Sequence, residues 1–453
     1  MRSTSARSAS RARDRLVAER AVDRAARLAG DLRDRRLVTV RAILPGDLDP
    51  LPGLAASARD HRVFWQNGEH RIAGTGAAAI VRARGSDRIG LASEAWRALN
   101  ANAIVDGDTP GAVLVGGFSF ADDSAWQDFP PLRAVVPRVL VESRDGRATI
   151  SVSVLSGPGA AAQIRAARQD LRRLFDAGPV LQAPTLTIRR LAGVPGDAAW
   201  LRSVAHAARD VREKRIVKVV LAREALLRAS RAIDPAGVVH ALRTAHPDAR
   251  VFWIGTPRAS FLGATPEWLV RVHGREVRTT ALAGSVAAGA PGRALLASAK
   301  DRTEHAVVTD AIVAQLRAIS DRVLVPSQPT VSSIGYIQHL RTPIAARLRA
   351  RLGALGVAAR LHPTPAVAGA PRDAALRIIR AREGFDRGWY AGGVGWVDAT
   401  GDGEFAVAIR SALVRGRNAR VFAGAGIVAA SQPEAELAET EAKLAPMLRA
   451  LGA

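Results

Sequence analysis

The feature that most constrains the fold of this chain is a series of short apolar runs, most of which follow one another without an intervening helix. In the second half, such runs lie at 251–254, 260–263, 268–272, 277–280, 389–398, 405–414 and 421–423. Runs of this length bounded by Gly, Pro and Asp are typical of strands. Strands that follow strands along the chain form antiparallel sheets, so we expect an α+β fold rather than a doubly wound parallel sheet.

The rest of the chain completes this pattern. Further strands are predicted at 38–44, 62–65, 77–83, 112–120, 138–143, 149–155, 217–227 and 333–340. Helices are predicted at 93–102, 163–175, 197–214, 235–246 and 300–318, and a last one after a capping box formed by Ser431 and Glu434. Two G-x-G-x-x-A matches, at 74–79 and 424–429, lack the surrounding elements of a dinucleotide site, which excludes that class.

No linker divides the 453 residues cleanly. We therefore expect one large domain at 37–453, with an N-terminal part at 37–190 and a part at 197–453 that carries the motifs. Residues 1–36 are rich in Arg, Ser and Ala, and although 11–36 could form a polar helix, this composition predicts a disordered basic tail. Acidic residues such as Asp14 and Glu19 argue against a targeting peptide in this tail.

The net charge of +23 would suit a polyanionic partner such as a nucleic acid. Aromatic residues make up only 4% of the chain, which argues against platforms for stacking bases, so no nucleic-acid partner is expected. No apolar run reaches the ~18 residues of a membrane span, so no membrane partner is expected either. The lack of Cys suits a reducing compartment, and we expect a cytoplasmic monomer.

Lysine is rare in this strongly basic chain. It occurs only at Lys214, Lys218, Lys300 and Lys443, and every other basic residue is Arg. Arg keeps its proton at neutral pH, whereas Lys can lose one when its surroundings favour the neutral form. These positions are therefore candidates for a removable proton or a compact point charge.

Two predicted helices carry acids at helical spacing. Glu436, Glu439 and Lys443 recur at i, i+3 and i+7 on the last helix, and Asp301 and Glu304 stand at i, i+3 on the helix at 300–318. Stripes of this kind are common on solvated helix faces, where exposed pairs contribute little. The alternative is that the two helices face each other and supply oxygen ligands to a hard cation such as Mg²⁺.

Several phrases of the second half are more specific than these patterns. They are KVVLAR (218–223), GATPEWL (263–269), TTALAGS (279–285), KDRTEH (300–305), QHL (338–340), HPTPAVAG (362–369), AIRSA (408–412), AGAGIV (423–428) and ETEAK (439–443). In this order they closely resemble the chorismate-utilising enzymes, the family of isochorismate synthase, salicylate synthase, anthranilate synthase component I and aminodeoxychorismate synthase. The resemblance is dense from 197 to the C-terminus. It implies one large domain of two packed antiparallel sheets with outer helices and an active site between the sheets.

The resemblance also assigns roles to residues. It implies that Glu304 and Glu439 bind Mg²⁺, with Asp301 and Glu436 as neighbouring acids that hold metal-bound water. It implies that the substrate is chorismate, a dicarboxylate bound by the following residues: Ala281, Gly284, His339, Ala366, Arg410, Gly424, Ala425, Gly426 and Lys443. Arg410 and Lys443 would anchor carboxylates, and the amides of a glycine turn at 424–426 would form an anion-binding nest.

Within the family, Lys218 would be the general base that activates water and Glu267 the general acid that protonates the departing hydroxyl. For this chemistry Lys218 must be partly neutral and Glu267 must be protonated, which burial and neighbouring charges can achieve. Read without the resemblance, the same residues could be an ordinary strand lysine and a glutamate in a turn.

Three positions distinguish the reactions of the family. Relatives that use ammonia tend to have Gln in place of Lys218, aminodeoxychorismate synthases have a lysine in place of Ala283, and salicylate synthases usually have Thr in place of Ala366. We therefore expect an isochorismate synthase, for menaquinone or else for siderophore synthesis. A salicylate synthase, an anthranilate synthase component I and, from another class, a nucleic-acid-binding protein are the alternatives. One departure is that 286–289 lacks two arginines that commonly follow the TTALAGS phrase.

Overall fold

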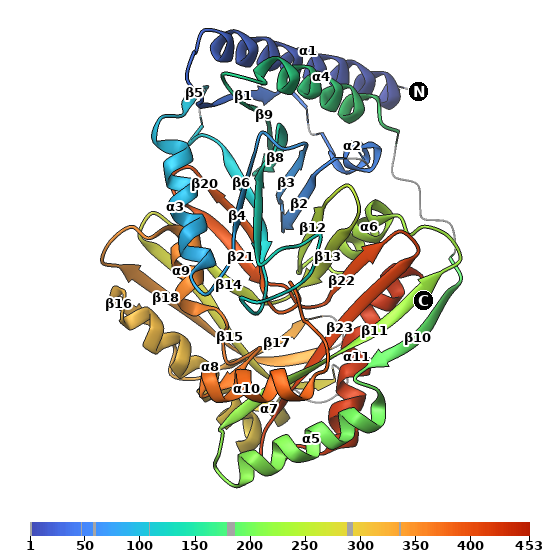
Figure 1. The fold of residues 1–453 in the computed structure, drawn as a ribbon, viewed down its shortest axis with the longest axis vertical. Coiled ribbons are helices and arrows are strands. Elements are labelled where there is room, and N and C mark those ends of the chain that lie inside the picture. Colours follow the sequence, from blue (N-terminus) through green and yellow to red (C-terminus); the bar gives the residue numbers. More distant parts are fainter. Residues whose placement is uncertain are drawn as a thin grey trace.

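The computed structural model describes residues 2–46, 48–57, 60–107, 109–178, 186–287, 293–334 and 337–453, with side chains from residue 10 onward except at 285–287, 300, 333, 334 and 337. Its strands form two large sheets with helices on the outside (Figure 1). Within these ranges all strand pairs are antiparallel except the short parallel pair of β1 and β5. The expected α+β class with two antiparallel sheets is confirmed.

The first sheet has 13 strands. From edge to edge they are β10 (Ile188–Val194), β11 (Lys218–Ala229), β23 (Asn418–Ile427), β22 (Ser411–Arg415), β13 (Ser260–Thr265), β12 (Arg250–Gly255), β2 (Arg62–Asn67), β3 (His70–Thr75), β8 (Val139–Arg144), β9 (Arg147–Leu155), β1 (Leu37–Leu44) and β5 (Ile104–Asp106), with β19 (Gly369–Ala370) paired to β11.

The second sheet has 10 strands. They are β16 (Ser320–Leu324), β18 (Ile337–Leu348), β15 (Glu276–Ala287), β14 (Trp268–His273), β21 (Gly403–Val407), β20 (Gly393–Asp398), β6 (Val113–Phe118), β7 (Leu132–Val136) and β4 (Ala79–Ala83), with β17 (Thr330–Ile334) paired to β18. Both sheets combine strands from the two halves of the chain, since β2 pairs with β12 and β6 pairs with β20. The parts at 37–190 and 197–453 therefore share their sheets.

A core of large apolar side chains joins the two sheets. Phe261 of β13 contacts Trp389 and Phe129, with ring centroids 6.0 Å apart in each pair, and Phe118 of the second sheet lies 5.9 Å from Phe405. All five rings are at most 4% exposed. Burying such rings supplies much of the stability of a fold of this kind, since each removes a large apolar area from water.

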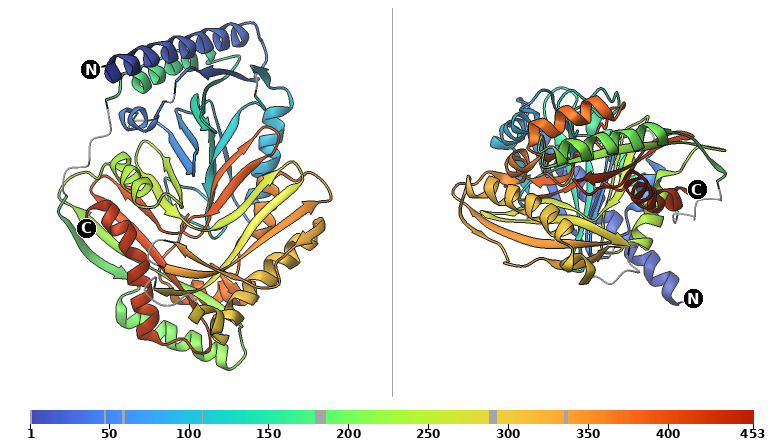
Figure 2. Two further views of the ribbon diagram at one scale, coloured as in Figure 1. Left: turned by 180° about the vertical axis from the view of Figure 1, so that it is seen from behind. Right: turned by 90° about the horizontal axis from the view of Figure 1, so that it is seen from below.

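The helices cover the outer faces of the sheets (Figures 1 and 2). They are α1 (Arg2–Gly30), α2 (Leu51–Ala56), α3 (Arg88–Ala101), α4 (Ala160–Asp176), α5 (Asp197–Arg212), α6 (Pro235–Ala245), α7 (Arg293–Ala297), α8 (Ala299–Arg317), α9 (Gly353–Leu361), α10 (Arg372–Arg382) and α11 (Pro433–Leu451). None of the described helices is both long enough and apolar enough to cross a membrane. α11 packs against β23 and α5.

The predicted disordered tail at 1–36 is wrong for the residues whose side chains are described. α1 packs on α4 and β1, and its small residues Ala18, Ala21, Val22 and Ala25 are at most 3% exposed. Their spacing of three and four residues puts them on one face of the helix. The prediction failed because the arginines on the other faces of the helix give the segment an amino-acid composition that is typical of disordered chains.

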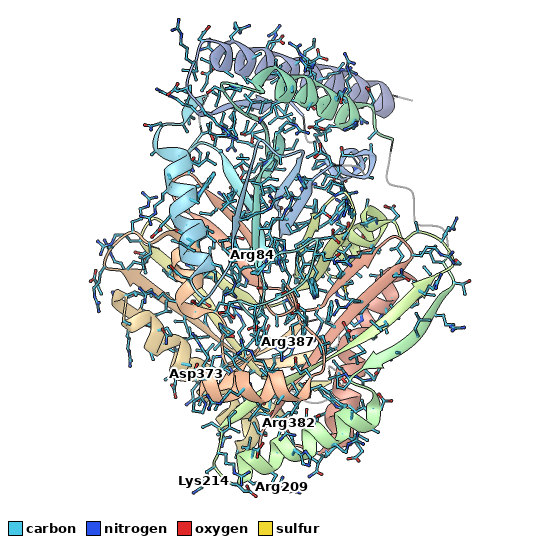
Figure 3. All side chains as sticks on the ribbon, in the orientation of Figure 1. Arg84, Arg209, Lys214, Asp373, Arg382 and Arg387 are labelled. Carbon is cyan, nitrogen blue, oxygen red and sulfur yellow. The ribbon has the colours of Figure 1, made fainter. Side chains whose placement is uncertain are left out.

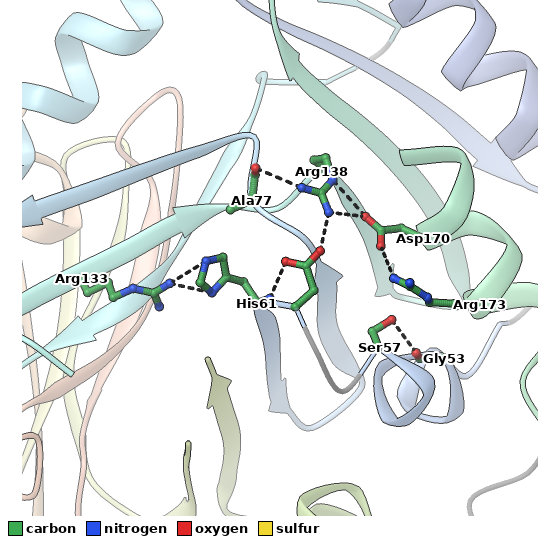
Figure 4. Close-up of polar contacts among 9 residues, drawn as sticks. Gly53, Ser57, His61, Ala77, Arg133, Arg138, Asp170 and Arg173 are labelled. Atoms are coloured by element: carbon green, nitrogen blue, oxygen red, sulfur yellow. Dashed lines mark hydrogen bonds and ion pairs between the residues drawn. The ribbon is translucent and has the colours of Figure 1, made fainter. Parts of the chain in front are cut away.

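An ion-pair network ties α4 to the first sheet (Figure 4). Arg138, just before β8, donates to Asp170 of α4 (3.0 Å) and to Asp60 (2.5 Å), and Arg173 lies 3.4 Å from Asp170. The Asp170 side chain is 1% exposed, and its burial raises the carboxyl pKa to about 6 in spite of both arginines. The network therefore fixes the position of α4, which in turn supports α1.

Three local predictions near the C-terminus are wrong. The run at 405–414 is not one strand but β21 and β22, which lie in different sheets. The chain crosses between the sheets at Ile409 and Arg410, and Arg410 has a φ of 50°. The capping box does not form, because the Ser431 hydroxyl accepts from the Val428 amide (3.1 Å) and Gln432 is the N-cap. The expected glycine turn at 424–426 lies inside β23.

Candidate active site

A cavity of about 110 Å³ lies where β11, β15, β23, α8 and α11 meet. Nearly all of the predicted site residues line it: Lys218, Glu267, Gly284, Asp301, Glu304, His339, Ala366, Arg410, Gly424, Gly426, Glu436, Glu439 and Lys443. They come from segments up to 225 positions apart in the chain, between Lys218 and Lys443, and from both sheets. We call this the site cavity.

Lys218 is the first residue of β11 and is 2% exposed. Its Nζ lies 2.8 Å from Oε1 of Glu304, which comes from the first turns of α8. Gly426 on the neighbouring strand gives this pair room, because a Cβ there would stand 2.6 Å from Oε1 of Glu304 and 3.0 Å from Cε of Lys218. The second glycine of the AGAGIV phrase, Gly426, is therefore needed to leave room for the buried ion pair.

Glu267 lies in the short link between β13 and β14 and is 7% exposed. Its backbone is held on both sides: its amide donates to Oγ1 of Thr265 (3.2 Å), and its carbonyl accepts from the amide of Val407 (3.0 Å). Burial raises the carboxyl pKa to about 7, although Lys218 and other cations of the cavity oppose the shift. Part of the Glu267 population is therefore protonated at neutral pH.

The acids of α8 and α11 face the same cavity. Glu439 pairs with Lys443, whose Nζ also donates to the carbonyl of Gly424 (2.9 Å), and Glu304 pairs with Lys218. Asp301 and Glu436 add two further carboxylates to the lining. The two acid-bearing helices therefore face one site, as one of the two interpretations predicted. The other interpretation, a stripe of acids on a solvated helix face, does not describe these residues.

This donor set suits a hard divalent cation. Mg²⁺ is usually bound through one or two carboxylates and several waters, and carboxylate oxygens are what α8 and α11 offer here. In the described part of the chain no three His, Asp or Glu side chains stand close enough together to hold a metal ion as they are. A cation at Glu304 and Glu439 would have to replace the two lysines as their partner.

Other residues of the cavity lining supply neutral hydrogen-bond donors and a guanidinium group. Burial, with Arg410 and Lys443 nearby, lowers the pKa of His339 to about 3, so its imidazole is neutral. Burial raises the pKa of Tyr390 to about 12, so its hydroxyl keeps its proton. Arg410 projects from the crossing between the sheets, and its left-handed backbone is the local strain that such a crossing requires.

The predicted anion nest at 424–426 does not form as a turn. β23 pairs with β11 so that Gly424 faces Ala222 and Gly426 faces Val220. The amide of Ala222 donates to Glu383 and the amide of Val220 donates to the carbonyl of Ala368, so both amides point away from β23. The pairs Ala222–Gly424 and Val220–Gly426 are therefore the non-hydrogen-bonded pairs of the β11–β23 ladder. Gly424 and Gly426 therefore turn their amides away from β11, and Ala425 is bonded to β11.

Two predicted residues do not line the cavity. Ala281 is 0% exposed and pairs with Thr342 inside the second sheet, and Ala425 is 0% exposed in β23. Gly284 lines it for a backbone reason: its φ of 72° allows a break in register between Ala283 and Ser285, which bends the end of β15 toward Asp301. The residues at 288–289 lie outside the described part of the chain, as do the side chains at 285–287.

The sequence analysis missed several lining residues: Val220, Leu282, Val367, Tyr390, Ile409 and Phe422. Most are apolar and cannot be told from core residues in a sequence. Tyr390 carried a signal that could have been used, because the chain has only two tyrosines and a buried tyrosine needs a partner for its hydroxyl.

Fold and cavity together define a class of protein. The chain is an α+β enzyme of two packed sheets, with a buried lysine, a glutamate of raised pKa and a cationic wall in one cavity between them. Such a cavity combines proton transfer with the binding of an anionic small molecule.

The comparisons with known proteins name the family. The chain belongs to the chorismate-binding enzymes, whose family model matches residues 24–452. It is 37% identical to the salicylate biosynthesis isochorismate synthase of Pseudomonas aeruginosa, over 96% of this chain and 93% of that one. It is 33% identical to the isochorismate synthase MenF of Bacillus subtilis, over 89% and 91% of the two chains. The resemblance found in the motifs is thereby confirmed.

Solved structures agree on the fold. The menaquinone-specific isochorismate synthase MenF of Escherichia coli matches 96% of this chain and 99% of its own, with a TM-score of 0.82 and 26% identity. Anthranilate synthase component I of Streptococcus pneumoniae matches 84% and 92% of the two chains, with a TM-score of 0.68 and 22% identity, which is evidence on the fold alone.

Proposed function

We propose that this chain is an isochorismate synthase, which adds water at C2 of chorismate as the C4 hydroxyl leaves and so forms isochorismate reversibly. The observation that carries the proposal is the presence of Lys218 and Glu267 in one buried cavity with a carboxylate-binding wall. A base for the attacking water and an acid for the departing hydroxyl are the two groups that this exchange needs. The relatives named isochorismate synthase support the same reaction.

Lys218 is proposed as the base. It can accept a proton from water only as a free amine, and in the structure its Nζ lies 2.8 Å from Oε1 of Glu304. The first requirement of catalysis is therefore that Glu304 finds another partner.

Mg²⁺ is proposed as that partner, held by Glu304 and Glu439, with Asp301 and Glu436 binding its waters. When bound, the ion would supply positive charge that stabilises negative charge on the substrate. Glu304 cannot serve the ion and Lys218 equally well. With Glu304 engaged elsewhere, Lys218 would be released from this pair to face the attacking water.

Glu267 is proposed as the acid. Its carboxyl pKa of about 7 leaves a substantial protonated fraction at neutral pH, and its backbone contacts with Thr265 and Val407 fix its position in the wall. The proton would pass from the Glu267 carboxyl to the C4 hydroxyl as the C4–O bond breaks, so that the hydroxyl leaves as water. In the reverse reaction, the water that adds at C4 returns a proton to the Glu267 carboxylate.

The substrate carboxylates are proposed to bind at the cationic wall. Arg410 and Lys443 supply the charge, and the amides of Gly424 and Gly426, which face away from β11, can add hydrogen bonds. Neutral His339 and Tyr390 complete the wall with donors that carry no charge at neutral pH.

The choice of product rests on two alanines in the lining. Ala283 offers no amine for a covalent intermediate, and Ala366 offers no hydroxyl beside the bound ring. With Lys218 as a base for water, the reaction is expected to stop at isochorismate. We propose menaquinone synthesis as the fate of this product, in keeping with the match to a menaquinone-specific enzyme. Deleting the gene should then abolish menaquinone in the source organism, whereas loss of a siderophore alone would reassign the pathway.

An isotope experiment tests the proposed chemistry. Turnover of chorismate in ¹⁸O-labelled water with Mg²⁺ should give isochorismate that carries one ¹⁸O atom, because the new hydroxyl comes from solvent. Mass spectrometry reads this directly. Unlabelled isochorismate would show that the hydroxyl migrates within the substrate and would remove the role given to Lys218.

A further inference from the structure

A second cavity in the described part of the chain is larger than the site cavity. A cleft of about 790 Å³ lies between α3, α10, the segment at 120–125 and the segment at 384–387. Figure 3 labels Arg387, in its wall, and Asp373, next to the lining residue Arg372. Its volume falls within the ~300–1,000 Å³ typical of small-molecule sites. We call it the α3–α10 cleft.

Two guanidinium groups in this cleft have no carboxylate within ion-pair distance among the described residues. Arg88 is 5% exposed, its NH2 donates to the carbonyl of Ser119 (2.8 Å), and its Nε has no partner. Arg372, at the start of α10, is half-buried. Both act on His362, whose pKa is lowered to about 3 by burial first and then by these two cations, so the charges converge on one wall. Buried cations without a partner favour an anionic ligand.

Most of the acids in the lining have partners of their own, and Asp87 is an exposed acid at the rim. Arg380 lies 3.7 Å from Asp122 and 3.5 Å from Asp123. Oδ2 of Asp386 accepts from the amide of Ala125 (2.8 Å) and from the hydroxyl of Ser124 (3.0 Å). The remaining walls are apolar, with Ile89, Phe120, Leu376 and Ile379. The cleft therefore combines the two arginines with an apolar surface, and Asp122 and Asp123, which are paired with Arg380, lie close enough to act on Arg88.

The cleft shares a wall with the site cavity. His362 and Pro363 line the cleft, and Ala366 and Val367, a few residues on, line the site cavity. The segment at 362–367 thus separates the two. Nε2 of His362 donates to the carbonyl of Phe120 (3.1 Å), which fixes the cleft end of the segment.

A second connection runs through Arg387. Its guanidinium stacks on the ring of Phe120, 4.2 Å from the centroid. Its NH1 donates to the carbonyl of Val367 and its NH2 to that of Val220, both at 2.8 Å, and Val220 and Val367 line the site cavity. Arg387 is held in turn by Glu383, which also accepts from the amide of Ala222 in β11 (2.7 Å). Cleft and site cavity are therefore joined by direct contacts.

We propose that the α3–α10 cleft binds a small amphipathic monocarboxylate, with its carboxylate between Arg88 and Arg372 and its apolar body against Phe120 and Leu376, and that this ligand inhibits the enzyme. The site cavity of about 110 Å³ is smaller than typical ligand sites, and the proposed inhibition requires that the segment at 362–367 shift toward the cleft when substrate binds. A ligand in the cleft opposes movement of the segment at 362–367 toward it. The inhibition rests on the proposed function, whereas the binding does not.

The binding test uses phenylacetate as probe and calorimetry as readout, with the full chain. Phenylacetate should bind with one site per chain, and uncharged phenylacetamide should bind much more weakly. Arg372→Gln should weaken phenylacetate binding about tenfold or more, since it removes a charge-assisted hydrogen bond. The matched control is Arg377→Gln, on the exposed side of α10 outside the cleft, and should leave binding unchanged.

A second variant keeps the test independent of charge. Leu376→Trp fills the cleft without changing an arginine and should abolish phenylacetate binding. Absence of binding to wild type, or equal binding to wild type and to both cleft variants, overturns the proposed site. Because this readout needs no turnover, its result stands even if the chain does not make isochorismate.

The inhibition is tested by rates of chorismate consumption. Phenylacetate should raise KM for wild type and for Arg377→Gln, whereas Arg372→Gln should keep its basal rate and lose the inhibition. Equal inhibition of wild type and Arg372→Gln would place the probe in the site cavity and overturn the link between the cavities. Binding that leaves KM unchanged would do the same.

Discussion

Among single residues, Lys218 gives the sharpest test of the proposed chemistry. Lys218→Arg keeps the positive charge beside Glu304, but guanidinium does not release a proton at neutral pH. Turnover of this variant should fall ~10²–10⁴-fold, the usual contribution of an acid–base group. Lys214→Arg, the same change at an exposed lysine, should leave the rate unchanged. A Lys218→Arg enzyme as fast as wild type would reduce Lys218 to a source of charge.

Glu267 sets the pH dependence. The carboxyl acts in its protonated form, and its pKa is raised to about 7 by burial, so the working form is complete well below pH 7 and is lost as pH rises through 7. A plot of kcat/KM against pH should therefore fall on its alkaline side from about pH 7. Glu267→Gln should lose most activity, and its residual rate should lack this fall. A wild-type profile that is flat between pH 6 and pH 9 would contradict the assignment.

Glu304 connects the base to the metal. Glu304→Gln keeps the shape of the side chain but removes its charge, so activation by Mg²⁺ should require at least about tenfold more ion, in line with the usual cost of weakening a metal site. Titration of the rate with Mg²⁺ measures this. Asp310→Asn, at an exposed acid of the same helix, is the matched control. Full activity of Glu304→Gln in the presence of a chelator would contradict the metal site.

Most site residues could be predicted because they belong to short sequence motifs. The geometry of these residues could not be predicted from the motifs. KVVLAR and GATPEWL located Lys218 and Glu267 correctly in the cavity. The TTALAGS phrase could not say that Ala281 would be buried in the second sheet and not line the cavity, because alternation along β15 is interrupted at Gly284. Tyr390 was missed because it belongs to none of the motifs.

At the scale of elements, strand patterns predicted well where the chain stays in one sheet. They failed at 405–414, since an apolar run does not reveal that its middle crosses from one sheet to the other. They failed again at 424–426, where the glycines look like a turn but leave room for Lys218 and Glu304 beside a straight strand. In both places, contacts with distant segments decided the conformation.

α1 gives a test at this scale. Ala25 is 0% exposed on the face of α1 that packs on the sheet, so Ala25→Asp would bury an unpaired carboxylate. Such a change typically costs several kcal/mol, and the melting temperature should fall by several degrees. Arg20→Asp introduces the same residue on the exposed side and should change it little. Equal melting temperatures for the two variants would restore the disordered tail.

At the scale of the whole molecule, the pairing of first-half with second-half strands could not be predicted from local patterns. The class of fold followed from strands succeeding strands, but the order of the two sheets depends on contacts such as β2 with β12 and β6 with β20. The same long-range pairing brings β11, β15 and β23 together at the site cavity. The monomeric state and cytoplasmic location stay predictions.

The net charge of +23 finds a use at this scale. A cationic molecule attracts a dianionic substrate over distances longer than a contact, which raises the rate of encounter at low ionic strength. The charge alone had also suited a nucleic-acid-binding protein. Membership of the chorismate-binding enzymes, matched over 24–452, favours the small dianion as the partner that this charge serves.

The most direct test of the central claim is to identify the product that the purified chain forms from chorismate and Mg²⁺. The account predicts isochorismate in a reversible mixture with chorismate, resolved by chromatography, with no signal from lactate dehydrogenase and NADH added to detect pyruvate. Pyruvate formed in step with chorismate loss, together with salicylate, would contradict the claim and make the chain a salicylate synthase.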